Sequence, residues 1–368
     1  MVDATRIQGL IEQSGLDAVM AASPENVLYL SGVNILTQRL IPDRLALCVW
    51  SREGQTAIVV CIHEEPQVRK DSRIANIHSY FEFEGSPMET VARVLRQMGL
   101  DGGRIGVEKR FLSVQHYEEL SDNLPGVTAI AADDLFTTLR AIKTPEEVAL
   151  LEGVATLTDR AVREAFEAAR PGDAERDVAG DIRRRLFAYG AEEVRPLMLG
   201  AGPNARFIHQ LPTAYRLSCG DLCRLDVGAL HQGYQSDLAH TAAVAPPAPR
   251  QRDAYRRLWE VHEEVIAAIR PGITGAEVYA VYTRSSQARG IFRRRPHIGH
   301  GLGLGMHEPP LLTPGCATPL EAGMVLCVEY TYAPDAELYH IEDTVHVTPG
   351  GCRVLSRAAD WSELFVIG

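Results

Sequence analysis

The chain has 368 residues, of which 46% are hydrophobic and 23% are charged, and its formal net charge at pH 7 is -11. This length exceeds what a single hydrophobic core usually supports, so we expect two domains. The negative charge disfavours binding to nucleic acid, and no apolar run approaches the roughly 18 residues that a membrane span requires. We therefore expect a soluble protein with no nucleic-acid or membrane partner.

The N-terminal sequence MVDATRIQGLIEQSGLDAVM contains acids and lacks the apolar stretch and cleavage site of an export signal. Seven cysteines are scattered along the chain, which argues against a disulfide framework. Both features indicate a cytoplasmic protein. Cys219 and Cys223 form a CxxxC pattern without a second pair, and we expect them to pack rather than to bind a metal.

Residues 1–138 form the first predicted domain. Helical patterns alternate there with short apolar runs at 16–22, 44–50 and 56–61, each bounded by turn residues. This alternation is typical of an α/β domain.

A long helix is predicted to open the second domain, which we place at residues 139–368. Thr144, Pro145 and Glu147 combine an N-cap hydroxyl, a proline at the first helical position and a Glu three residues after the cap. The helix should run until Pro171 and Gly172 stop it.

An internal duplication follows. AARPG at 168–172 returns as AIRPG at 268–272, and each is followed by a helical segment. Beyond those segments, each half has an apolar strand that carries an acid six residues after a glycine, namely Asp226 after Gly220 and Glu329 after Gly323. A second acid follows in each half; these acids are Asp237 and Glu342. Two related α/β units would thus direct four acids into one cleft.

Four carboxylates in one interior site would repel each other and lose hydration, so they need protons or cations. Two divalent cations meet this need. Oxygen-rich ligation with a single imidazole suits Mn²⁺, although Co²⁺, Fe²⁺ or Zn²⁺ can occupy the same site. Two ions about 3.5 to 4 Å apart can activate water and polarise a carbonyl, as in aminopeptidase-like sites.

The ordered set Asp226, Asp237, His300 in GHGLG, Glu329 and Glu342 resembles the five-ligand signature of the Xaa-Pro aminopeptidase and prolidase family. SPENVLYLSG at 23–32 is similar to the N-terminal creatinase/prolidase domain, and LRAIKTPEEVALLE at 139–152 is similar to the interdomain helix. The resemblance implies an α/β (α+β) fold class, with a creatinase-like α/β domain followed by a pseudo-two-fold pita-bread catalytic domain.

The resemblance also implies the role of each ligand. Asp226 would hold one ion, Asp237 and Glu342 would bridge both, and His300 with Glu329 would complete the other. Glu329 would in addition carry a proton from the attacking water to the leaving nitrogen, which is general acid-base work.

Two further histidines, His209 in FIHQLP and His307 in GMHEPP, match family positions that hold the substrate and stabilise the tetrahedral intermediate. The resemblance further implies a homodimer. The expected activity is hydrolysis of the amide bond before proline in Xaa-Pro dipeptides or short Xaa-Pro peptides, of the aminopeptidase P or prolidase type.

Two alternatives remain open. One is a hydrolase of a non-peptide C–N bond, like creatinase or ectoine hydrolase, and the other is a catalytically inactive peptide-binding module. Five intact ligands favour the peptidase over both.

Several residues depart from the family pattern. His240 and His340 stand where the family usually has arginine, and together they suggest that a charged bridge behind the ligands is replaced by imidazoles. His297 lies three residues before His300 and is a weaker site candidate.

Three consecutive arginines, Arg293, Arg294 and Arg295, precede the His300 motif. We favour a solvated turn at this run over binding of a substrate carboxylate.

Overall fold

The computed structural model describes residues 3–41, 43–334 and 337–368, and it divides into two compact units between Arg140 and Ala141. The sequence places the boundary between 138 and 139. Both units mix helices and strands, in agreement with the predicted fold class. Among the described residues, none of the helices combines the length and the apolar character that crossing a bilayer requires.

The first unit contains one six-stranded sheet in the order β4-β3-β2-β1-β5-β6. Its strands β1 and β2 are buried along their whole length, which explains their continuous apolar sequences. The strands are β1 (Ala18–Ala21), β2 (Leu47–Ser51), β3 (Thr56–Cys61), β4 (Ile77–Tyr80), β5 (Arg104–Val107) and β6 (Thr128–Ala131). The helices are α1 (Ala4–Gln13), α2 (Pro24–Ser31), α3 (Leu36–Leu40), α4 (Glu65–Asp71), α5 (Pro87–Gln97), α6 (Val114–Asn123) and α7 (Asp133–Ala141).

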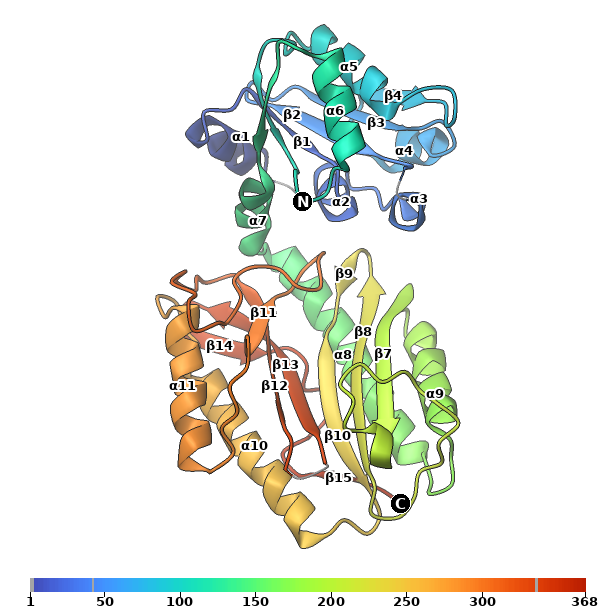
Figure 1. Ribbon diagram of the computed structural model, residues 1–368, viewed down its shortest axis with the longest axis vertical. Coiled ribbons are helices and arrows are strands. Elements are labelled where there is room, and N and C mark those ends of the chain that lie inside the picture. The colour runs from blue at the N-terminus through green and yellow to red at the C-terminus, as the bar shows by residue number, and fades with distance from the viewer. Residues whose placement is uncertain (1–2, 42, 335–336) are drawn as a thin grey trace. The chain divides into compact units, whose positions relative to one another are not determined.

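The helices of the second unit come in two pairs, with α8 (Pro145–Ala168) and α9 (Glu175–Ala188) in one and α10 (Pro249–Ala268) and α11 (Gly275–Ala288) in the other. The expected start of α8 is present, because the Thr144 side chain accepts from the Glu147 backbone and the Glu147 side chain accepts from Thr144 N. The pairs α8/α9 and α10/α11 flank the large sheet (Figure 1).

The large sheet has nine strands, six of which follow the order β11-β12-β13-β10-β8-β7. Its long antiparallel strands are β7 (Glu193–Ala201), β8 (Leu222–His231), β10 (Leu238–Val244), β12 (Val325–Tyr332) and β13 (Tyr339–Thr348). Short strands complete it, namely β9 (Tyr234–Gln235), β11 (Gly299–Gly301), β14 (Gly351–Val354) and β15 (Phe365–Ile367), and a 3₁₀ turn η1 (Gly202–Asn204) follows β7.

The expected duplication is visible in the turns after α8 and α10. Gly172 and Gly272 both have positive φ, and their amides donate over 2.8 Å to Leu217 O and Leu320 O respectively. One apolar core then packs α8 and α9 against β7 and β8, and a second packs α10 and α11 against β12 and β13. The sheet face away from the helices is left for the site.

Gly299 sets how closely β11 approaches β12. Its φ is +152°, and a Cβ there would lie 2.2 Å from Cys327 O. We expect Gly299→Ala to lower the free energy of unfolding by about 2–3 kcal/mol, because the added methyl pushes the backbones apart. Gly153→Ala is the matched control, since Gly153 lies in α8 with nothing within 4 Å. That change should be neutral or stabilise by up to about 1 kcal/mol. Urea unfolding measures both, and equal effects would contradict this account.

Candidate metal centre

Four acids lie on one face of the large sheet, and three of them, on β8, β13 and β12, stand in one row. Asp226 on β8 lies opposite Ala239 on β10. Ala239 lies opposite Glu342 on β13, and Glu342 lies opposite Glu329 on β12. Directly opposite residues share a face of a sheet. Asp237 precedes Ala239 by two positions, so the alternation of side chains places it on that same face.

His300 completes the cluster from the edge strand β11. Its Nε2 lies 3.9 Å from each of three carboxylate oxygens, on Asp237, Glu329 and Glu342. Its Nδ1 lies 3.0 Å from Gly301 O. If each metal–ligand bond is about 2.1 Å long, two ligand atoms of one cation can lie no more than about 4.2 Å apart. The three distances therefore fit ligands around a common ion and are too long for hydrogen bonds.

Burial and mutual repulsion shift the pKa values of the acids. Burial, followed by the neighbouring carboxylates, raises the pKa of Asp237 and Glu342 well above the ordinary values. Burial also raises the pKa of Asp226. Burial acts in the same direction on Glu329, but the hydrogen bond with His340 is the largest of the effects that oppose it, and the pKa of Glu329 is lowered to about 2. Without a cation, the cluster therefore opposes ionisation of most of its own members.

The imidazole of His300 is in the state that a ligand needs. Burial, followed by the neighbouring His307, lowers the pKa of His300 to about 4. At neutral pH its ring is thus uncharged. With a proton on Nδ1 directed at Gly301 O, the lone pair of Nε2 faces the acids.

Unpaired atoms point to a missing partner. The buried atoms His300 Nε2, His340 Nδ1 and Glu342 Oε1 have no hydrogen-bond partner among the described residues. Potential ligand atoms lie within 4.8 Å of one another in two groups, which are Asp237, His300, Cys327 and Glu342, and Glu329, His340 and Glu342. Buried orphan atoms are costly unless something satisfies them. This donor set fits divalent cations.

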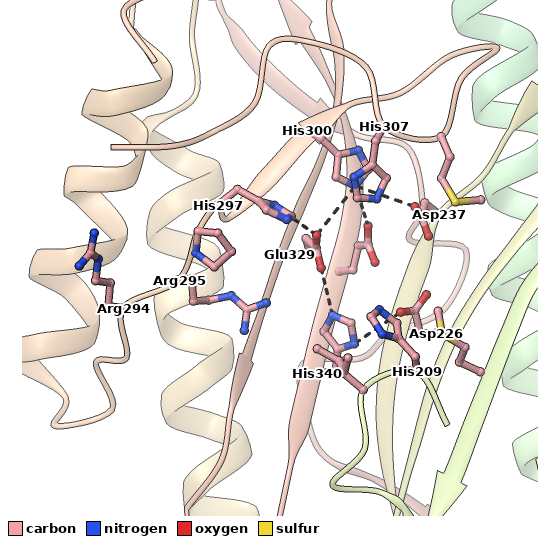
Figure 2. Close-up of a pocket in the computed structure, with 15 residues that line it drawn as sticks. His209, Asp226, Asp237, Arg294, Arg295, His297, His300, His307, Glu329 and His340 are labelled. Carbon is pink, nitrogen blue, oxygen red and sulfur yellow. Dashed lines mark hydrogen bonds and ion pairs between the residues drawn. The ribbon is translucent and has the colours of Figure 1, made fainter. Parts of the chain in front are cut away.

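The acids open into a cavity of about 430 Å³. In Figure 2, His307 lies beside His300, and His209 lies beside Asp226. The rings of His300 and His307 stack with centroids 3.8 Å apart. His209 and His307 are both exposed, so they can contact a molecule that enters the cavity. His297 lines the wall as well, with Nδ1 3.5 Å from Glu329 Oε1.

The three arginines at 293–295 have different surroundings in the folded protein. Arg294 and Arg295 line the cavity, whereas Arg293 donates over 2.7 Å to Ala333 O. Arg295 extends toward the acids, and Arg294 extends away from them (Figure 2). Arg295 also donates to Thr331 Oγ1, while its buried Nε has no hydrogen-bond partner among the described residues. The favoured interpretation of this run as a solvated turn is therefore wrong for Arg295.

The predicted imidazole bridge of His240 and His340 does not form. His240 lies on the helix side of β10, where its Nε2 is 3.0 Å from Asp159 Oδ1 and its ring stacks on Trp361. His340 lies on the cavity side of β13, against Glu329. The reason is the period-two alternation of strands, since His340 is two residues from Glu342 but His240 is three from Asp237.

Cys327 was not predicted as part of the site. It lies two residues before Glu329 on β12, and its buried Sγ is among the potential ligand atoms. The same spacing of two along a strand was the available signal for both Cys327 and His340. Burial raises the pKa of the Cys327 thiol well above its usual value, so the thiol stays protonated.

Comparison with known proteins places the chain among peptidases. Residues 149–349 match metallopeptidase family M24, and residues 4–142 match the creatinase/prolidase N-terminal domain. The Xaa-Pro dipeptidase of Pyrococcus furiosus is 28% identical over 350 residues, covering 94% of this chain and 95% of that protein. The solved dipeptidase PepE from Mycobacterium ulcerans has a TM-score of 0.85 at 28% identity, covering 99% of this chain and 96% of that one. The prolidase from Pyrococcus furiosus has a TM-score of 0.82 at 26% identity, with coverages of 96% and 100%.

The fold is thus the pita-bread fold preceded by a creatinase-like domain, and the cluster on its large sheet fits divalent metal ions. The chain belongs to metallopeptidase family M24 and is a peptidase.

The repulsion among the acids is measurable without a substrate. Removing divalent ions with EDTA at pH 8 should lower the melting temperature, and adding Mn²⁺ should restore it. Metal-free Glu342→Gln should be more stable than the metal-free wild type by at least about 1 kcal/mol, because it removes a buried charge whose raised pKa disfavours folding as pH rises. It should gain less from Mn²⁺.

Glu321→Gln, at an exposed position of the same unit, serves as the control and should match the wild type in both states. Thermal unfolding with and without Mn²⁺ gives the comparison. A metal-free Glu342→Gln protein less stable than the metal-free wild type would show that the carboxylate is already neutralised by other means.

Proposed function

We propose that this protein is a dinuclear-metal hydrolase that cleaves the amide bond before proline in Xaa-Pro dipeptides and short Xaa-Pro peptides. The carrying observation is that Asp226, Asp237, His300, Glu329 and Glu342 gather on one face of the large sheet, with ligand-like spacings around His300 Nε2. The relatives named Xaa-Pro dipeptidase and prolidase support the substrate class.

Each ligand has its own place in the proposal. Asp226 would hold one ion, His300 and Glu329 would hold the other, and Asp237 and Glu342 would be shared between the two. The oxygen-rich set makes Mn²⁺ the first ion to supply, with Co²⁺, Fe²⁺ and Zn²⁺ as further candidates. The bound ions supply water activation and polarisation of the scissile carbonyl.

The chain's own residues supply proton transfer and substrate binding. Glu329 faces the cavity and is ionised at neutral pH, so it accepts the proton of the attacking water and returns it to the departing proline nitrogen. His307 and His209 stand at opposite ends of the acid cluster and hold the substrate around its carbonyl (Figure 2).

Arg295 supplies the grip on the free carboxylate of the substrate. Its guanidinium is directed into the cavity, and its buried Nε has no hydrogen-bond partner among the described residues (Figure 2). A charge-assisted hydrogen bond to a carboxylate would satisfy that nitrogen. This grip favours dipeptides, whose terminal carboxylate lies on the proline next to the scissile bond.

The proposal includes a cytoplasmic homodimer. The cytoplasmic setting is supported by free thiols at all seven cysteines, four of them buried. The homodimer is supported by the family resemblance of the first 138 residues.

An assay of the Mn²⁺-loaded protein tests the activity. It should hydrolyse Xaa-Pro dipeptides, and Xaa-Pro tripeptides more slowly, in preference to small amide or guanidino compounds. Turnover of the amide or guanidino compounds alone would contradict the peptidase and support a creatinase-like hydrolase. No turnover of any substrate would support the catalytically inactive peptide-binding module. Glu329→Gln should keep its metal content and lose at least about 100-fold in kcat, because the proton acceptor is gone.

The role of Arg295 has a separate signature. Arg295→Ala should raise KM for a Xaa-Pro dipeptide by about 10- to 100-fold, which corresponds to one lost charge-assisted hydrogen bond, and change kcat little. Arg294→Ala is the matched control, because the neighbouring side chain extends away from the acids, and it should stay within about twofold of the wild type. Equal KM effects in the two variants, or a loss confined to kcat, would contradict the grip.

A further inference from the structure

His340 enters the cavity from the centre of the large sheet. It lies on β13 two residues before Glu342, so both side chains project from the same face. The side chain is 1% exposed and lines the cavity between Glu329 and Asp226 (Figure 2). Its two ring nitrogens face two different acids of the cluster, Glu329 and Asp226.

The two nitrogens make different contacts. Nε2 lies 3.3 Å from Glu329 Oε2 and forms a hydrogen bond with it. Nδ1 lies 4.0 Å from Asp226 Oδ2, is buried, and has no hydrogen-bond partner among the described residues. A separation of 4.0 Å is too long for a hydrogen bond. It still lies within the limit of about 4.2 Å for two ligands of one cation.

The arrangement repeats that of His300. In each ring one nitrogen is anchored to an oxygen, Gly301 O for His300 and Glu329 Oε2 for His340. The other nitrogen is buried, unpartnered and about 4 Å from a carboxylate of the row. Imidazoles that bind metals almost always donate their second N–H to a carboxylate or a backbone carbonyl, and this bond selects the tautomer. A proton on Nε2 of His340 leaves the lone pair of Nδ1 facing Asp226.

We propose that His340 Nδ1 is a direct ligand of the divalent cation held by Asp226, so that the centre contains two imidazoles. The proposal rests on the metal centre of the proposed function. The ion at Asp226 would otherwise receive only oxygen atoms from the protein. An added imidazole strengthens binding of Zn²⁺ and Co²⁺ relative to Mn²⁺, because nitrogen donors suit those ions better.

X-ray absorption of the full-length protein loaded with two equivalents of Zn²⁺ counts the imidazoles directly. The wild type should show an average of about one imidazole per zinc, since two rings serve two ions. His340→Gln and His300→Gln should each halve that average. His240→Gln is the matched control, because this equally buried imidazole binds Asp159 on the helix side of the sheet, and it should leave the average unchanged.

Competition with a zinc chelator gives a second readout. His340→Gln should weaken binding of one of the two zinc ions by at least about 10-fold, and His240→Gln should not. An average of one half imidazole per zinc in the wild type would overturn the proposal, since His300 alone would then be the nitrogen ligand, and would leave the dinuclear centre and the peptidase intact. Failure of the wild type to bind zinc would overturn the centre itself. Because the wild-type spectrum decides between these results, the test does not depend on any variant folding.

Discussion

Repulsion among four clustered carboxylates, three of them buried, is the constraint on which the second unit depends. Asp226, Asp237, Glu329 and Glu342 share one face of the sheet, and burial raises the pKa of three of them. A protein gains nothing in stability from such a cluster unless cations compensate it. The strands, the close approach of β11 to β12 and the anchored imidazole of His300 all serve to present ligand atoms at distances that suit ions.

The duplication explains how the chain builds this site. Each half contributes a helix pair, an apolar core behind the sheet and two acids on the open face. The acids meet where β10 pairs with β13, which is the contact between the two halves of the sheet. Rigid strands hold the ligands, whereas the exposed histidines His209 and His307 come from the connecting loops. This division suits a centre whose metal must be fixed while its substrate enters and leaves.

The strand-borne acids were predictable because they recur at matching places in the two halves of the sequence, and the start of α8 was predictable from the capping pattern at Thr144. The sequence could have shown that His240 and His340 lie on opposite faces of the sheet, because side chains alternate between the two faces along each strand. The direction of Arg295 could not be predicted from the sequence, since it depends on a loop whose path the local sequence does not determine. The orientation of each imidazole ring could not be predicted from the sequence either. The partner atoms Gly301 O and Glu329 Oε2 come close to the rings only in the folded sheet.

Metal-loaded crystals give the most direct test of the central claim, which is that paired cations neutralise the acid row. Anomalous diffraction from Mn²⁺-soaked crystals of the full chain should show two peaks about 3.5 to 4 Å apart, one beside Asp226 and one beside His300, both in contact with Asp237 and Glu342. An absence of peaks at full Mn²⁺ concentration, with the four acids still packed together, would contradict the account.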